Sequence, residues 1–503
     1  MMKFCYLLIL LLNVAVTVFC ADKYSRKDFP PGFVFGAGTF AYQVEGAAHE
    51  DGRTPSVWDT FSNGGGDVAV DQYHRYKEDV KLMAETGLEA YKFSISWSRL
   101  IPNGRGHVNP KGLEYYNNLI NELISHGIEA HVSLFNYDHP QSLEDEYGGW
   151  ISRKIVRDFT AYADVCFREF GDRVSSWITI NEPNVFAQGG YDLGITPPGR
   201  CSPPFGIGHC YKGNSSYEPY LAAYHMLLAH ASTVRLYRNK YQDKQHGVIG
   251  VTFFAIWLVP LTNSTEDAAA TERAKDFFFG WFLNPLVFGD YPEMMKKIVG
   301  TRLPALTKQE SELVKGAFDF IGLIHYTTIY VQENSESLKL ETRDFTADAA
   351  VNMFLDKDDP FVIIPEEFPL RPWGLQALLE YIKQTYGNPP VYIHENGQVS
   401  PHNSSLEDTS RVKYLNAYIG SLLDAIRNGS NTRGYFVWSF LDAYEILGNG
   451  FEMSFGLYFV DVEDPGLKRK PKQSAHWYSN FLKGNIQIER ENLSNPARQH
   501  LSQ

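Results

Sequence analysis

Short runs rich in β-branched and aromatic residues alternate with helix-like runs along most of the chain. Eight of them are candidate strands, at residues 33–42, 90–97, 130–135, 176–180, 248–253, 318–326, 391–394 and 434–439. This alternation is the pattern of parallel strands joined by crossover helices. Eight such units predict an α/β fold of the closed (β/α)8 or TIM-barrel type.

A barrel of this kind would account for most of the 503 residues. No Pro/Ser-rich linker or charge block interrupts residues 30–480, and α/β barrels often run long as one domain. We therefore expect a single domain over residues 21–503, with elaborated loops at the C-terminal ends of the strands.

The first 20 residues have the features of a secretory signal peptide. Lys3 precedes the apolar run FCYLLILLLNVAVTVF, which ends at Phe19 and is followed by Cys20 and Ala21. A charged start, an apolar centre and small residues at the end are typical of such signals, and the run is short for a membrane span. We predict cleavage near Cys20. Asn-x-Ser/Thr sequons, which fit a secretory lumen, occur at Asn214, Asn263, Asn403, Asn428 and Asn492.

Cleavage would leave three cysteines in the mature chain. Cys201 and Cys210 lie in one Pro/Gly-rich loop, PPGRCSPPFGIGHC, and an oxidising lumen favours a local bridge between them. Cys166 falls on the apolar face of a helical pattern and is expected to be a buried thiol. Three cysteines without paired histidines do not indicate a zinc site, and we expect neither a metal nor a cofactor.

The charge of the chain restricts its partners. A formal net charge of −13 and a pI of about 5.6 disfavour binding to nucleic acid and to anionic membrane surfaces. A neutral or small polar substrate fits better. The oligomeric state cannot be inferred from the sequence.

Two carboxylates follow predicted strands in similar contexts. Glu182 stands in WITINEP after the fourth strand and Glu395 in VYIHENG after the seventh. Barrel enzymes carry their catalytic groups at these strand ends. A pair of carboxylates can cleave an acetal, because one protonates the leaving oxygen and the other captures the developing oxocarbenium ion. Carboxylates at a barrel mouth also bind metals or form salt bridges, so position alone leaves both possibilities open.

The motifs around these positions resemble glycoside hydrolase family 1, and its plant β-glucosidase branch in particular, from about residue 28 to residue 484. The matching segments are FPPGFVFGAGTFAYQVEGA, YKFSISWSR, HPQSLEDEYGGW, TINEP, HENG, VWSFLDAYE and FGLYFVD. The resemblance implies a retaining β-glucosidase acting on terminal β-D-glucosyl residues of small-molecule glucosides. The C-terminal sequence ARQHLSQ is not a retention signal of the KDEL type, so we expect a protein of the secretory pathway that resides in the apoplast or the vacuole.

The resemblance also implies roles for individual residues. Glu182 would be the acid/base and Glu395 the nucleophile, with Asn181 bonding the sugar 2-hydroxyl. Arg99 and Tyr326 would contact the nucleophile and keep it ionised, since a nearby cation lowers a carboxyl pKa. The further sugar-binding positions implied are Gln43, Asn136, Trp438 and Glu445.

Several positions depart from the family pattern. Asn136-Tyr137 stands where the family usually has His-Trp, and Ile324-His325 precedes Tyr326 where it usually has Asn-Tyr. Ile446 and Ser454 replace a usual Trp and Arg. Changed hydroxyl donors should shift the sugar preference more than they abolish the chemistry.

Three functions therefore remain open. The first is hydrolysis of a glucoside. The second is transfer of glucose from an acyl-glucose to an acceptor alcohol, which HENGQ and the Ile-His-Tyr variation also fit. The third is silent sugar binding, which the presence of both glutamates disfavours.

Overall fold

The computed structural model describes residues 23–362, 364–402, 404–447 and 450–489. The predicted signal peptide and the sequons at Asn403 and Asn492 lie outside these residues. Within the described part, no helix is both long and apolar enough to cross a membrane.

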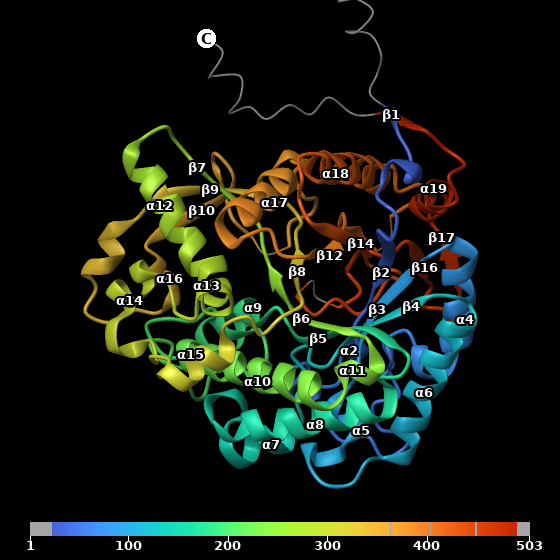
Figure 1. The fold of residues 1–503 in the computed structure, drawn as a ribbon, viewed down its shortest axis with the longest axis horizontal. Helices are drawn as coiled ribbons and strands as arrows, with labels where there is room; N and C mark the ends of the chain where they lie inside the picture. The colour runs from blue at the N-terminus through green and yellow to red at the C-terminus, as the bar shows by residue number, and fades with distance from the viewer. Residues whose placement is uncertain (1–22, 363, 403, 448–449, 490–503) are drawn as a thin grey trace, which may run out of the picture.

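Eight parallel strands close into a barrel in the order β12-β14-β2-β3-β4-β5-β6-β8 (Figure 1). Their bounds are β2 Val34–Gly38, β3 Ala90–Ser94, β4 Glu129–Ser133, β5 Val174–Asn181, β6 Val248–Phe254, β8 Phe320–Ile324, β12 Val391–Asn396 and β14 Thr432–Trp438. Each contains or overlaps one of the eight predicted runs, so the barrel prediction is confirmed.

Helices surround the barrel, and additional ones occupy its loops (Figure 1). The longer helices are α4 Gln72–Thr86, α6 Pro110–Ser125, α8 Lys154–Phe170, α10 Glu218–Lys240, α12 Thr265–Lys275, α17 Trp373–Tyr386, α18 Thr409–Arg427 and α19 Gln473–Leu482. The shorter ones are α2 Ala41–Val44, α3 Val57–Phe61, α5 Trp97–Leu100, α7 Gln141–Tyr147, α9 Pro183–Gln188, α11 Gln242–Gln245, α13 Trp281–Phe288, α14 Glu293–Val299, α15 Lys308–Val314 and α16 Phe345–Ala349.

Helix α8 illustrates how sequence periodicity places these helices. Phe159, Ala163, Cys166, Phe167 and Phe170 recur at helical spacing and are all fully buried. This apolar stripe is the face that a surface helix turns toward the core. The burial of Cys166, which is a free thiol, agrees with the prediction.

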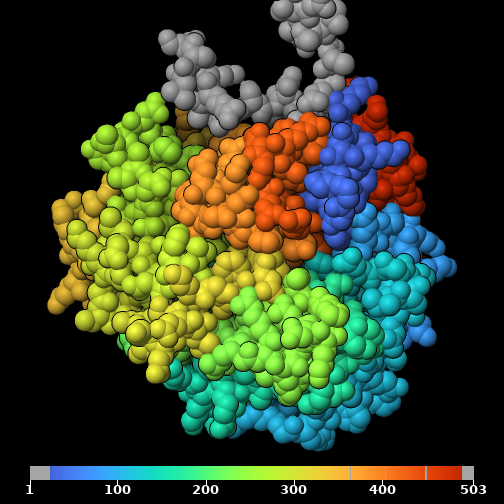
Figure 2. Space-filling view, in the orientation of Figure 1, coloured from blue at the N-terminus to red at the C-terminus, as the bar shows by residue number. Residues whose placement is uncertain are grey.

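Smaller sheets lie outside the barrel. A four-stranded sheet has the order β11-β10-β9-β7, and its bounds are β7 Trp257–Pro260, β9 Thr328–Glu333, β10 Val351–Asp356 and β11 Asp359–Pro360. Among the described residues, three two-stranded sheets pair β1 Lys23–Tyr24 with β18 Ile488–Glu489, β13 Ser400–Pro401 with β15 Met453–Ser454, and β16 Tyr458–Val460 with β17 Arg469–Pro471. The first of these pairs brings the two ends of the described chain together, and Figure 2 shows the blue and red segments adjacent on the surface.

An aromatic cluster fills part of the barrel interior. His131 packs on Phe436 with ring centroids 4.8 Å apart, and His394 contacts the same ring at 5.4 Å. Burial lowers the pKa of both imidazoles, which keeps them neutral. His131 pairs in register with Lys92 of β3. Lys92 therefore lies next to a cluster of aromatic rings and neutral imidazoles inside the barrel.

Candidate active site

Glu182 occupies a sharp turn between strand β5 and helix α9. Its backbone is left-handed, with φ 48° and ψ 53°, and Pro183 begins the helix. The Glu182 backbone N–H donates to Thr252 O of β6 at 2.8 Å, which ties the turn to the next strand of the barrel. The Tyr137 hydroxyl donates to Glu182 Oε2 at 2.9 Å. The turn thus holds the carboxylate at the C-terminal end of the barrel.

Glu395 lies at the end of β12 and is 3% exposed. Its Oε1 accepts a hydrogen bond from Lys92 Nζ at 2.8 Å, and its Oε2 accepts one from the Tyr326 hydroxyl at 3.0 Å. Lys92 also donates to Asn181 Oδ1 at 3.0 Å. A cation, an amide and a phenol therefore converge around one carboxylate.

The two glutamates have different electrostatic surroundings. Desolvation, followed by the charge of Glu395, raises the pKa of Glu182 to about 8. Desolvation also raises the pKa of Glu395, but the Lys92 ammonium and the Tyr326 hydroxyl act against that rise. Lys92 contacts Glu395 directly and so stabilises its carboxylate form, and a single proton shared by the two glutamates is therefore expected on Glu182. At neutral pH Glu182 is then the acid and Glu395 the anion.

Arg99 does not contact Glu395, so the predicted contact is wrong. The strand ends at Ser94, and Arg99 lies in helix α5, where its Nε donates to Glu45 Oε2 at 2.8 Å. Its Nη2 donates to Gly46 O at 2.7 Å. The helical turn carries the guanidinium away from β12, and the cation beside the nucleophile position is Lys92. The predicted contact of Tyr326 with Glu395 is present.

The remaining sequence-predicted sugar positions come from several different segments of the chain. Gln43, on α2, donates from Nε2 to Glu445 Oε2 at 3.1 Å. Trp438 ends β14 and packs on Phe40 with centroids 4.6 Å apart. Asn136 follows β4 and is 4% exposed. Desolvation, with the nearby charges of Asp442 and Glu395, raises the pKa of Glu445 to about 8.

Four residues of this group each keep one buried polar atom without a protein partner. These atoms are Gln43 Oε1, Asn136 Oδ1, Asn181 Nδ2 and Glu445 Oε1. An unpaired buried polar group costs about 1–3 kcal/mol, so such a set is expected where a polar ligand supplies the partners. A polyhydroxylated ring can act both as donor and as acceptor and suits this set.

The departures from the family pattern also have defined environments. His325 Nδ1 lies 2.8 Å from Ala255 O, and burial lowers its pKa to about 4, so the imidazole is neutral. Its backbone N–H donates to Glu395 O at 3.0 Å, which supports the end of β12. Ile446 is half-buried against the core. Ser454 contacts Arg411 through its backbone oxygen, at 3.1 Å.

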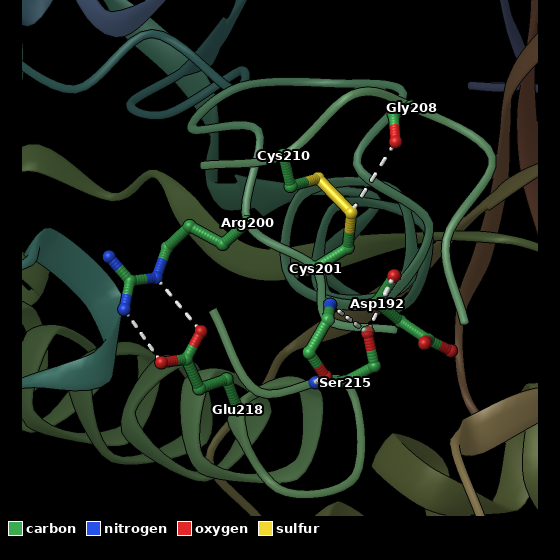
Figure 3. The surroundings of a disulfide bond; sticks show 8 residues. Asp192, Arg200, Cys201, Gly208, Cys210, Ser215 and Glu218 are labelled. Atoms are coloured by element: carbon green, nitrogen blue, oxygen red, sulfur yellow. Dashed lines mark hydrogen bonds and ion pairs between the residues drawn. A yellow bond between two sulfur atoms is a disulfide. The ribbon is translucent and has the colours of Figure 1, made fainter. Parts of the chain in front are cut away.

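The loop between Leu193 and α10 carries the predicted disulfide. Cys201 and Cys210 are bonded, with their Cα atoms 5.4 Å apart (Figure 3). Next to the bridge, Arg200 Nε and Nη2 donate to the two oxygens of Glu218 at 2.8 and 2.6 Å. The bidentate pair ties the loop to the start of α10.

The comparisons with known proteins agree with this site. The model of glycosyl hydrolase family 1 matches residues 25–487. Beta-glucosidase 11 of Arabidopsis thaliana is 60% identical, over 95% of this chain and 96% of the relative. Hydroxyisourate hydrolase of Glycine max is 58% identical, over 95% of this chain and 86% of the relative.

Solved structures give the same result. A rice β-glucosidase in a covalent complex with glucose is 46% identical with a TM-score of 0.87, over 91% of this chain and 99% of that one. An aphid myrosinase is 34% identical with a TM-score of 0.82, over 93% of this chain and 100% of that one. The family match covers both glutamate positions, the barrel and nearly all of the described residues, and the chain is a member of glycosyl hydrolase family 1.

Proposed function

We propose that this protein is a retaining β-glucosidase that hydrolyses terminal, non-reducing β-D-glucosyl residues of small-molecule glucosides. The observation that carries the proposal is the unequal pair of glutamates at the ends of β5 and β12. Glu395 accepts from both Lys92 and Tyr326, whereas the hydrogen-bond donor to Glu182 is the neutral Tyr137 hydroxyl. Such a difference suits a nucleophile and an acid/base.

The first chemical step uses Glu182 as an acid. A Glu395 oxygen forms a bond to the anomeric carbon while the bond from that carbon to the leaving oxygen breaks. The Glu182 proton passes to the leaving oxygen, so the aglycone departs as a neutral alcohol. Lys92 and Asn181 stay hydrogen-bonded at the base of the site and hold the nucleophile in place.

In the second step Glu182 acts as a base. Formation of the ester neutralises Glu395, which removes a charge that raises the pKa of Glu182. The Glu182 carboxylate then takes a proton from water as the water oxygen bonds to the anomeric carbon. The ester bond breaks and Glu395 is released as a carboxylate, giving net retention.

The relatives support this reaction class. Several relatives more than half identical to this chain are β-glucosidases by name, and the rice structure carries covalently bound glucose. The soybean relative is named for hydroxyisourate, which is not a sugar, so that compound belongs in a substrate test. Glucosyl transfer and silent sugar binding are not needed to account for the site.

The test is a turnover assay with an aryl β-glucoside, with product configuration followed by NMR. We expect glucose to appear first as the β-anomer, with no turnover by Glu395→Gln. A parallel assay with hydroxyisourate, and one with an acyl-glucose plus an acceptor alcohol, would show whether either replaces hydrolysis. Release of the α-anomer first would contradict retention.

We further propose that the protein passes through the secretory pathway to the apoplast or vacuole. The disulfide between Cys201 and Cys210 and the exposure of the sequon asparagines Asn214, Asn263 and Asn428 support this route. Treatment of the plant-expressed protein with an endoglycosidase should increase its electrophoretic mobility. Unchanged mobility, with residues 1–20 still present at the N-terminus, would contradict it.

A further inference from the structure

One contact at the site lies outside the set of residues that the family resemblance implies. The Tyr137 hydroxyl donates to Glu182 Oε2 at 2.9 Å. The same hydroxyl also lies 3.5 Å from the backbone oxygen of Glu182. Both contacts of the phenol are therefore with Glu182, the residue whose carboxyl group changes protonation state in both chemical steps.

The position of Tyr137 is fixed by its surroundings. Its backbone is left-handed, with φ 65°, and its side chain is 1% exposed. The ring packs on Phe186 with centroids 4.9 Å apart, and Phe186 lies on α9, the helix that Glu182 caps. The ring and the hydroxyl of Tyr137 therefore both contact the segment that begins helix α9. Because packing already fixes the side chain, little conformational entropy is lost when the hydrogen bond forms.

We propose that Tyr137 is a positioning residue that fixes which oxygen of Glu182 carries the proton and stabilises its carboxylate form between the two steps. This inference rests on the proposed function. Because Oε2 accepts from the phenol, the transferable proton sits on Oε1. When Glu182 gives up that proton, the hydrogen bond becomes charge-assisted and strengthens.

The charges facing Glu182 define what the phenol can change. Glu395 raises the pKa of Glu182, while Lys92 and the Tyr137 hydroxyl lower it. Burial and both carboxylates raise the pKa of Tyr137 itself well above its usual value, so it stays a donor. The Tyr326 hydroxyl is occupied by Glu395. Tyr137 is therefore the one neutral donor to Glu182 among the described residues.

The test compares Tyr137→Phe with wild type in the pH dependence of kcat/KM on an aryl β-glucoside. Loss of the donor destabilises the Glu182 carboxylate, so the basic limb should move to higher pH, by about one unit. Tyr291→Phe is the matched control, because its buried hydroxyl has no protein partner. It should leave the limb unchanged.

A second variant guards against misfolding. Tyr137→Leu keeps an apolar side chain against Phe186 and carries no hydrogen-bond donor, so in a folded, active variant the basic limb should move in the same direction. A basic limb that stays in place in active, folded variants would overturn the role of Tyr137 while leaving the glucosidase assignment intact. A wild type that turns over no β-glucoside would overturn the proposed function, and this inference with it.

Discussion

Lys92 Nζ lies 2.8 Å from Glu395 Oε1, and both side chains are shielded from water inside the barrel. The same ammonium is 3.0 Å from Asn181 Oδ1, so one cation joins the ends of β5 and β12 through strand β3. A buried ion pair of this kind gains most when its remaining hydrogen bonds are satisfied. Tyr326 satisfies the second oxygen of Glu395.

Removal of this cation should change the acid limb of the pH profile. Glu395 must be ionised to attack, and Lys92 lowers its pKa. Lys92→Met therefore raises that pKa, so the acid limb of kcat/KM should move to higher pH and activity should be lost first at low pH. Even at the optimum kcat/KM should fall roughly 100-fold.

Arg99→Lys is the informative comparison. The lysine keeps a cation near Glu45, but it loses the hydrogen bond that Arg99 Nη2 donates to Gly46 O. We expect a lower melting temperature and an unmoved acid limb. An acid limb displaced by Arg99→Lys and not by Lys92→Met would restore the role that the sequence resemblance implied for Arg99.

The positions of the two glutamates follow from the sequence, whereas the donors that contact them depend on the local backbone. Glu182 and Glu395 follow short apolar strands, and a barrel brings such strand ends to one face. The contact that the family resemblance implied for Arg99 is absent because the backbone turns into helix α5 after Ser94, where Arg99 pairs with Glu45. Lys92 lies within strand β3, and its place in the alternation of that strand was the signal that could have identified it as the cation beside Glu395. The Tyr137 contact depends on a left-handed backbone at a non-glycine residue, which periodicity does not reveal.

Variants of the two glutamates should behave differently toward azide. Glu182→Gly lacks the acid/base but can still form the glycosyl-enzyme from a substrate with a good leaving group, and azide should then accelerate turnover and give a β-glucosyl azide. Glu395→Gly should not turn over natural glycosides. Product analysis by NMR checks both, and rescue of Glu395→Gly with retained configuration would reverse the assignment.

The separation of the carboxyl groups is a geometric prediction. A retaining mechanism needs about 5–5.5 Å, which leaves no room for an intervening water. A crystal structure of the protein with a bound inhibitor would measure it. About 9 Å would instead indicate inversion.

The disulfide loop should contribute to stability. Replacing both Cys201 and Cys210 by Ser frees a short loop, and the loss should be on the order of 2–3 kcal/mol. Denaturant unfolding measures this, with Cys166→Ala as a comparison that leaves the bridge intact. A non-reduced digest should link Cys201 to Cys210, and a peptide linking either one to Cys166 would contradict the pairing.

The altered sugar pocket should limit activity on simple glucosides. Asn136 and Ile446 replace larger, ring-bearing side chains of the family, so contacts that strengthen at the transition state are reduced. Asn136→His combined with Ile446→Trp should raise kcat/KM on an aryl β-glucoside. An unchanged or lower value in a folded protein would indicate a pocket adapted to another sugar or to an acceptor.

The most direct test of the central claim is mass spectrometry of the protein after reaction with a 2-deoxy-2-fluoro-β-glucoside that bears a good leaving group. The fluorine slows both steps, and the leaving group lets the first proceed, so a glycosyl-enzyme accumulates. We predict one fluoroglucosyl group per chain, on the peptide that contains Glu395, and none in Glu395→Gln. A label on a different residue, or no label in an enzyme that hydrolyses β-glucosides, would contradict the account.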